Sequence, residues 1–388
     1  MTKFIRNPIA ALASALLATA PMWASAQQGV TANEIVLGEI QPLTGAASVP
    51  ALGLSVGTKM AIAEANLSGG VNGRKLRLIS EDDGYVVARS VQAARKLITG
   101  DRVFAITATS NSGASAAILP MLKESGIPVI NINSFPDSFH TPVVPNIFVA
   151  GATHQDSLEQ LISQLTTRYP GKKWATVTPD DEMGSLMREG IERAHKSLNL
   201  NVVYSATYRR GQKDFSAEML SATAAGADIL IAGGIVTENI AMVKELERQG
   251  KKIPVGFSWA GRYSSAIHKM MGSAFENVYL IDYIVADESA EGRAFVARAS
   301  KLLSEDDFKR VNRFSYMSYA GTRVLIEAMR RCGNAVTWSC TIKELEATQN
   351  YETAVAGRFS FSPTSHFSKQ PLTLMKANPK TFNFDPLK

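Results

Sequence analysis

The feature that most restricts the fold of this chain is an alternation of short apolar segments with segments of helical spacing, which runs along the chain twice. The first series begins with a predicted strand at 34–40. It continues with a helix at 52–66, a strand at 74–82, a helix at 88–98 and a βαβ unit that ends at 127–132. Such an order is typical of a parallel sheet covered by helices on both faces.

A second series of the same kind follows. Its predicted helices lie at 153–168, 183–197, 214–225 and 239–250, and its strands at 172–179, 201–208, 227–234, 251–258 and 276–282. Helices near 289–304, 314–332 and 341–348 come next, and the chain ends in two β-like pieces, AVAGRFSFSP and PLTLMKAN. A chain of 388 residues exceeds what one core usually serves.

The first series is short of helices, so the helix at 314–332 is expected to return to it. This return predicts three crossings between two α/β lobes, near 148–151, 283–286 and 358–363. Lobe 1 would comprise 27–149 plus 285–360, and lobe 2 would comprise 150–284 plus 361–388. Since no Pro-rich linker separates them, we expect the lobes to meet closely around a ligand cleft.

The first 26 residues predict a secretory signal peptide. MTKFIR carries two positive charges, an apolar run follows, and Ala24-Ser25-Ala26 fits a cleavage site after Ala26. The run is short for a membrane span, and no Cys at the cleavage point indicates a lipid anchor. We therefore expect an exported mature chain.

Composition excludes several classes of function. The net charge is +6, but Lys and Arg are scattered, so a nucleic-acid partner is not expected. The five His residues are dispersed and form no ligand-spaced pair, and GLSVG at 53–57 lacks dinucleotide spacing. We therefore predict no metal and no cofactor. In an exported chain, Cys332 and Cys340 favour a disulfide over two buried thiols.

The stretch TSNSGAS at 109–115 follows an apolar strand and opens a helix. A helix N-terminus offers free N–H groups and a partial positive charge, and hydroxyl groups add donors. Ser112, Gly113 and Ser115 therefore suggest a seat for a carboxylate or phosphate; a plain helix cap is the alternative. A nucleophilic Ser would need a base and an oriented partner, which the sequence does not supply.

Other polar turns follow predicted strands in lobe 1. QPLTGAAS at 41–48 has small residues, such as Ala46, that permit a ligand to approach, or it is a plain turn. Ser134 and Phe135 follow the fourth strand and offer a donor and an apolar wall; a capping role is the alternative for Ser134. In EDDGYVV the adjacent Asp residues point to opposite faces, which favours a turn over acid–base work. Tyr85 in this turn is a candidate for the cleft mouth.

In lobe 2, Trp259 in FSWAGRY ends a predicted strand on the cleft side. It is either a stacking wall for a ligand or a packing residue at the hinge.

Several motifs together resemble the branched-chain amino acid (leucine/isoleucine/valine-binding-like) type of periplasmic solute-binding proteins. They are EIVLGEIQPLTG, the run AIAEANLSGGVNGRKL, EDDGY, YRRGQKDFSA, ADILIAGG and GRFSF. The resemblance covers essentially the whole mature chain. It implies two Rossmann-like lobes of the type I periplasmic binding fold, joined by three hinge strands, which trap a small ligand and hand it to an ABC permease.

The resemblance also implies site residues. In the family, the loop matching TSNSGAS holds the ligand carboxylate, which carries over to Ser112, Gly113 and Ser115. Family members that bind amino acids hold the ammonium with an acidic residue of lobe two, where this sequence has Trp259. A lobe-two tyrosine that often covers the ligand is Met183 here. These departures favour an organic acid without an amine, with an amino acid as the alternative unless Glu238, Asp180 or Asp181 pairs with it.

The sequence thus predicts a periplasmic, monomeric binding protein that captures a small carboxylate-bearing ligand for an ABC permease and is not an enzyme. A ligand sensor that feeds a membrane signalling protein is the alternative, and a hydrolase would need a Ser–His–acid set that the sequence does not show.

Overall fold

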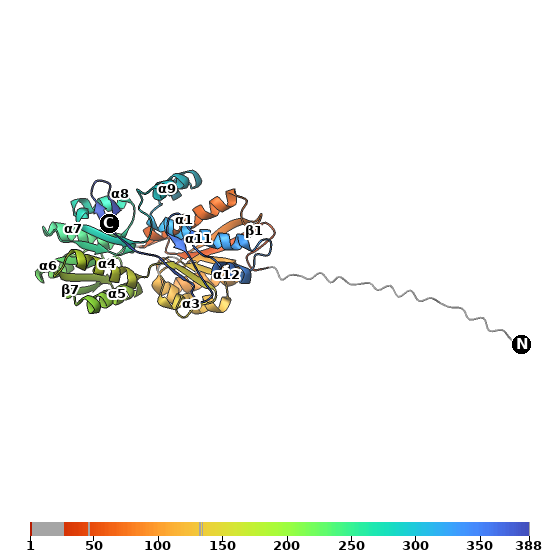
Figure 1. Ribbon diagram of the computed structural model, residues 1–388, viewed down its shortest axis with the longest axis horizontal. Helices are drawn as coiled ribbons and strands as arrows, with labels where there is room; N and C mark the ends of the chain where they lie inside the picture. Colours follow the sequence, from red (N-terminus) through yellow and green to blue (C-terminus); the bar gives the residue numbers. More distant parts are fainter. Residues whose placement is uncertain (2–26, 46, 132, 134, 388) are drawn as a thin grey trace.

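The computed structural model describes residues 1, 27–45, 47–131, 133 and 135–387. The predicted signal peptide, apart from Met1, lies outside this range. The described chain forms two lobes side by side, each a sheet with helices on both faces (Figure 1). This is the predicted α/β architecture with a cleft between two lobes.

Lobe 1 is built on a parallel sheet of strand order β13-β5-β4-β3-β1-β2. Its strands are β1 (Glu34–Gln41), β2 (Lys75–Asp82), β3 (Ala105–Ala108), β4 (Val129–Asn131), β5 (Ile147–Gly151) and β13 (Phe367–Lys369). Its helices are α1 (Ser48–Leu67), α2 (Val87–Arg95), which continues as a π-helix (Lys96–Gly100), α3 (Ser112–Ser125), a 3-10 turn (Asp137–Phe139), α9 (Ala290–Leu302), α10 (Glu305–Phe308), α11 (Arg313–Arg331) and α12 (Trp338–Glu346). A small hairpin joins β11 (Tyr351–Glu352) to β12 (Arg358–Phe359).

Lobe 2 has strand order β15-β14-β10-β9-β8-β6-β7, in which β14 runs antiparallel to both of its neighbours, β10 and β15. Its strands are β6 (Lys173–Pro179), β7 (Asn201–Tyr208), β8 (Ile229–Ala232), β9 (Val255–Phe257), β10 (Val278–Asp282), β14 (Thr373–Asn378) and β15 (Asn383–Pro386). Its helices are α4 (His154–Arg168), α5 (Glu182–Leu198), α6 (Ser216–Ala224), α7 (Val236–Arg248), α8 (Ser265–His268) and the 3-10 segments η3 (Trp259–Gly261) and η4 (Lys269–Asn277).

The chain crosses between the lobes where the sequence predicts it in two of three places. The first crossing follows β5 and the second follows β10. The third expectation, near 358–363, is wrong, because β13 still pairs with β5 of lobe 1 and the chain crosses only at 370–372. Residues 361–369 therefore pack with lobe 1, and with this change the division into two lobes stays our proposal. β5 is a further difference, because the sequence predicts a crossing and not a strand at IFVAG.

The long helices α1 and α11 pack closely enough that two glycines are required between them. A Cβ on Gly53 would overlap the Asn312 side chain, and one on Gly57 would overlap the Ser315 carbonyl oxygen. The glycines of GLSVG therefore serve helix packing. This contact holds α11, which comes late in the chain, against lobe 1, as the sequence predicts.

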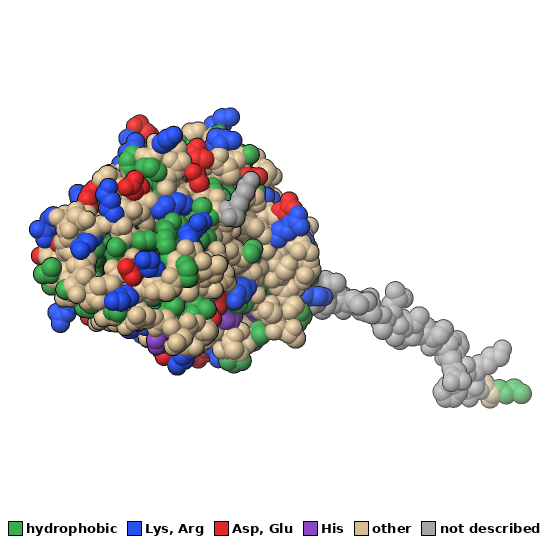
Figure 2. Space-filling model, turned by 60° about the vertical axis from the view of Figure 1, so that its left-hand side comes forward, with side chains coloured by type: hydrophobic (Ala, Val, Ile, Leu, Met, Phe, Trp, Pro, Cys, Tyr) green, Lys and Arg blue, Asp and Glu red, His purple; other side chains and the backbone are tan. Residues whose placement is uncertain are grey.

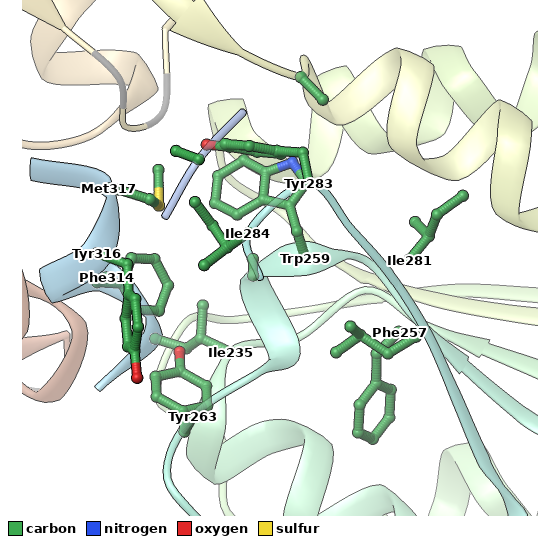
Figure 3. Packing of buried hydrophobic residues seen from close by; sticks show 14 of the residues in the cluster. Ile235, Phe257, Trp259, Tyr263, Ile281, Tyr283, Ile284, Phe314, Tyr316 and Met317 are labelled. Atoms are coloured by element: carbon green, nitrogen blue, oxygen red, sulfur yellow. The ribbon is translucent and has the colours of Figure 1, made fainter. Parts of the chain in front are cut away.

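The main hydrophobic core continues from lobe 2 through the hinge into α1 and α11. Figure 3 shows its middle, where Trp259, Tyr263 and Ile284 lie near Phe314 and Met317 of α11. A second cluster lies on the α2–α3 side of the lobe 1 sheet. The hinge is thus a packed region that fixes one wall of the cleft.

Three further expectations concern the whole chain. Cys332 and Cys340 are joined in a disulfide between the end of α11 and α12, as predicted. Among the described residues, the structure has no helix of the length and apolarity that a membrane span requires. On the face shown in Figure 2, Lys and Arg side chains are interspersed with Asp and Glu, so that face carries no single-sign field.

Candidate ligand-binding site

The carboxyl ends of the parallel strands of both lobes meet at a hollow that both lobes line and that opens to solvent. Strand ends of this kind are where open α/β sheets bind ligands. Lobe 1 lines it with Gln41, Pro42, Ala47, Pro50, Ala51, Leu54, Tyr85, Ser110, Asn111, Asn133 and Phe314. Lobe 2 lines it with His154, Met183, Ile235, Trp259 and Ala260. None of these described lining residues is Asp, Glu, Lys or Arg.

The polar wall of the hollow is the turn between β3 and α3. Asn111 caps α3 by accepting from the Ala114 backbone N–H at 3.0 Å, and its Nδ2 donates to Ser110 Oγ at 3.2 Å. Asn133 Nδ2 donates to the Ser110 carbonyl oxygen at 2.9 Å. These bonds fix Ser110 and Asn111 at the positive end of the α3 dipole. The turn therefore presents neutral donors to the hollow.

The three residues that the sequence singles out in this turn lie just beyond the lining. Ser112 and Ser115 are buried, and Ser115 Oγ lies 2.6 Å from Thr109 Oγ1. Gly113 faces α5 of lobe 2, with Glu182 among its nearest neighbours. The turn does border the hollow, but it does so through the two residues before α3.

Of the other predicted site residues, some line the hollow and some do not. Tyr85, Met183 and Trp259 line the hollow as expected. Phe135 does not: it packs edge-on against Phe367 and His140 in the second core cluster. The apolar wall expected there is instead supplied by Phe314 of α11, which no motif indicated. Ala46 and Ser134 lie outside the described residues.

Trp259 combines both roles that the sequence left open. Its indole ring is 2% exposed, lines the hollow and stacks on His154 at a centroid distance of 4.6 Å. The Arg313 guanidinium lies 4.8 Å from the same ring, and Tyr283 and Phe314 meet it at an angle. Burial lowers the pKa of His154 to about 3, so the residue is neutral at neutral pH.

The cation behind Trp259 belongs to a buried ion cluster at the hinge. Asp282, at the end of β10, accepts from Arg313 Nε at 2.9 Å and from Arg262 Nη1 at 3.0 Å. Arg262 also pairs with Asp287 at 3.1 Å. Burial alone would raise the pKa of Asp282, but the two arginines outweigh it and hold that pKa below its ordinary value.

A second ion group joins the lobes beside the hollow. Tyr85 of lobe 1 donates to Asp181 Oδ2 of lobe 2 at 3.3 Å, and Arg210 pairs with the same oxygen at 2.7 Å. Arg210 Nη1 also lies 3.5 Å from Glu238 Oε1. Both carboxylates that might have met a ligand ammonium are thus paired with Arg210. Asp180, the third candidate, is exposed.

Several lining residues were missed by the sequence analysis, chiefly Gln41, Ser110, Asn111, Asn133 and His154. Gln41 carried a readable signal, because it is the first residue of the polar turn QPLTGAAS that follows the first predicted strand. Asn133 and His154 follow β4 and β5 in the same way. In the sequence, however, nothing distinguishes a lining residue from a cap at such positions.

A family model described as periplasmic binding protein matches residues 34–382. Among curated relatives, the Leu/Ile/Val-binding protein homolog 7 of Brucella abortus (strain 2308) is 23% identical over 313 residues, which cover 77% of each chain.

Solved structures share the fold. A branched chain amino acid ABC transporter protein from Thermus thermophilus with bound valine has a TM-score of 0.82 at 17% identity, covering 92% of this chain and 96% of that one. A solute binding protein of an ABC transporter from Rhodopseudomonas palustris HaA2, in complex with p-hydroxybenzoic acid, has a TM-score of 0.80 at 18% identity, with the same two coverages.

Proposed function

Because this chain belongs to the periplasmic binding protein family, we propose that it captures a small carboxylate-bearing ligand between its lobes and delivers it to an ABC permease. The observation that carries the proposal is the hollow lined by both lobes, with the Ser110–Asn111 turn at the N-terminus of α3. Neutral donors at a helix N-terminus stabilise an anion without a fixed cation. Closure of the lobes supplies the contacts of lobe 2.

We further propose that the ligand has no charged amine. Asp181 and Glu238 are both paired with Arg210, and the described lining holds no carboxylate. An ammonium placed there would be buried without a counter-ion, which costs on the order of several kcal/mol of binding free energy. The Trp259 and Phe314 rings suit an apolar or aromatic body. The similar structures with bound valine and p-hydroxybenzoic acid illustrate the two kinds of ligand, a carboxylic acid with an amine and one without.

Binding without chemical change is part of the same proposal. Ser115 is bonded to Thr109, and His154, the histidine of the lining, is a weak base because its pKa is about 3. We therefore propose no catalytic role. From the family and the predicted signal peptide, we also propose that the protein is periplasmic, with residues 1–26 removed.

The test is a thermal-shift screen of refolded protein that lacks residues 1–26. The panel pairs L-leucine and L-valine with 4-methylpentanoate, benzoate and p-hydroxybenzoate, and each hit is titrated by calorimetry. A ligand at 100 times its Kd should add about 2.7 kcal/mol of stability. Hits among the acids without an amine support the proposal. Hits among amino acids alone would overturn the amine-free ligand, and no carboxylate hit at all would overturn carboxylate capture.

A further inference from the structure

Gln41 is a fully buried residue at the end of β1 that lines the hollow. Neither its Nε2 nor its Oε1 has a hydrogen-bond partner among the described residues. A buried polar atom without a partner destabilises the folded chain, and here both ends of one amide are in that state. Such a cost is retained where a partner arrives from outside the chain, and the hollow is where it can arrive.

Gln41 and Ser110 lie at the carboxyl ends of neighbouring strands. β1 and β3 run parallel, Gln41 is the last residue of β1 and Ser110 lies two residues beyond β3, and both line the hollow. Ser110 Oγ accepts from Asn111 Nδ2 and keeps its own O–H as a donor. A ligand carboxylate at this turn therefore lies within reach of the Gln41 amide.

The chemistry of the amide restricts what else the ligand carries. A carboxylate is an acceptor only and uses Nε2, which leaves Oε1 in need of a donor. An ammonium would supply one, but as a charged group in an uncharged lining it is disfavoured. A hydroxyl supplies a donor at no charge and also accepts.

Resting on the proposed function, we propose that the ligand is a hydroxy acid with its hydroxyl next to the carboxylate, and that Gln41 is the residue that selects it. Nε2 donates to the carboxylate while Oε1 accepts from the hydroxyl. One side chain thus reads both groups at once, and an acid that lacks the hydroxyl leaves Oε1 buried and unpaired.

The experiment uses ligands that share one skeleton and differ in one substituent on the carbon next to the carboxylate. L-leucine, 2-hydroxy-4-methylpentanoate and 4-methylpentanoate form one set; phenylglycine, mandelate and phenylacetate form another. Calorimetric titration of the wild-type protein should give a Kd for each hydroxy acid at least about tenfold below that of its des-hydroxy partner. Equal Kd values within a set, or a preference for the amine or for a matched carboxamide, would overturn the inference.

Gln41→Leu tests the assigned residue, because it keeps the volume and removes both polar atoms. The ratio between des-hydroxy and hydroxy Kd values should fall to about one, while the des-hydroxy acid still binds. Gln92→Leu, at an exposed position of α2 in the same lobe, should keep the wild-type ratio. A Gln41→Leu protein that retains the preference would overturn the role of Gln41, and if this variant does not fold, the wild-type series still decides.

The outcomes separate this inference from the proposed function. If no carboxylate binds, carboxylate capture fails and the hydroxy-acid inference fails with it. If carboxylates bind without regard to the hydroxyl, only the inference fails.

Discussion

The two lobes line the same hollow with different chemistry. Lobe 1 provides neutral hydrogen-bonding groups at its strand ends, from Gln41, Ser110, Asn111 and Asn133. Lobe 2 provides Met183, Ile235, Ala260 and the Trp259–His154 stack, and its ionic groups lie behind this wall, paired with one another. The neutral hydrogen-bonding side chains of the site therefore come mainly from lobe 1, which also contributes apolar residues such as Leu54 and Phe314, whereas lobe 2 contributes mainly apolar and aromatic surface.

This difference assigns a separate task to each lobe. Directional hydrogen bonds distinguish ligands, whereas apolar area contributes affinity with little selectivity. We infer that lobe 1 selects the ligand and that lobe 2 covers it when the lobes close, with the Tyr85–Asp181 bond holding the closed form. The variants below test this division of roles in order of expected effect.

Arg313 lies in the hinge, where it contacts residues of both lobes, and its replacement should have the largest effect of all. It starts α11 of lobe 1, stacks on Trp259 of lobe 2 and pairs with Asp282 in the hinge. Arg313→Met leaves a buried carboxylate with part of its charge uncompensated. We expect the free energy of unfolding in urea to fall by about 3–5 kcal/mol.

Arg310→Met is the matched control, since its side chain is 46% exposed and pairs with Asp307 on the surface. Its cost should stay below about 1 kcal/mol. Equal losses in the two variants would mean that the hinge cluster contributes no more than a surface pair, and that the wall around Trp259 is held by packing alone.

Trp259→Ala should have the next largest effect, and on affinity without selectivity. Removing the buried ring takes away the main apolar surface of lobe 2, so we expect about 2–4 kcal/mol of binding free energy to be lost for every ligand of a series. Calorimetric titration measures the loss, and Trp259→Phe, which keeps a ring, should lose less. A Trp259→Ala protein that binds with wild-type affinity but altered ligand preference would reverse the roles of the lobes.

Ser110→Ala should weaken carboxylate binding by about 1–3 kcal/mol, because it removes a donor to a desolvated anion. Ser112→Ala is the matched comparison, two residues along the same turn and buried but outside the lining. Its Kd should stay within about twofold of the wild type. If Ser112→Ala costs more than Ser110→Ala, the seat lies deeper in α3 than the hollow indicates, where the sequence alone had placed it.

The fold followed from the sequence because its signals are local. Periodicity located both sheets, and the scarcity of helices in lobe 1 predicted the return of α11, which Gly53 and Gly57 allow. The errors fall where local signals are weakest. β5 is fully buried and too short to show a period, and β13 has three residues whose place is set only by pairing with β5.

The binding site could be predicted from the sequence only in outline. Polar turns after strands were recognisable, since the topology brings parallel strand ends together. Which residue of a turn faces the hollow depends on where the helix begins; α3 begins at Ser112, and the two residues before it, Ser110 and Asn111, line the hollow. Phe314, and not the predicted Phe135, lines the hollow. Side-chain packing between distant segments decides which ring lines a cavity. No single-sequence pattern carries that information.

The smallest expected effect is that of pH on affinity, because the described lining holds no charged side chain and its one histidine is neutral. Burial sets the pKa of His154 to about 3, with Asp181 raising it and Arg210 and Arg313 lowering it. Between pH 7.5 and 5.5 the ligand carboxylate also stays ionised. The Kd should therefore change less than about twofold across this range, and a tenfold change near pH 6.5 would mean that His154 titrates in the folded protein.

Stability should respond to the same pKa even though affinity does not. A histidine whose folded pKa lies below its ordinary value contributes stability that is fully present above pH 6.5 and is lost as pH falls from there towards 3. The loss from one such group is at most about 1.4 kcal/mol per pH unit. His154→Phe keeps a ring against Trp259 and cannot titrate, so its urea-unfolding free energy should fall less steeply than that of the wild type between pH 6.5 and 5. Equal pH dependence of the two unfolding free energies would show that the folded protein protonates His154 without cost. The lobe 2 side of the hollow would then be more hydrated than its burial indicates.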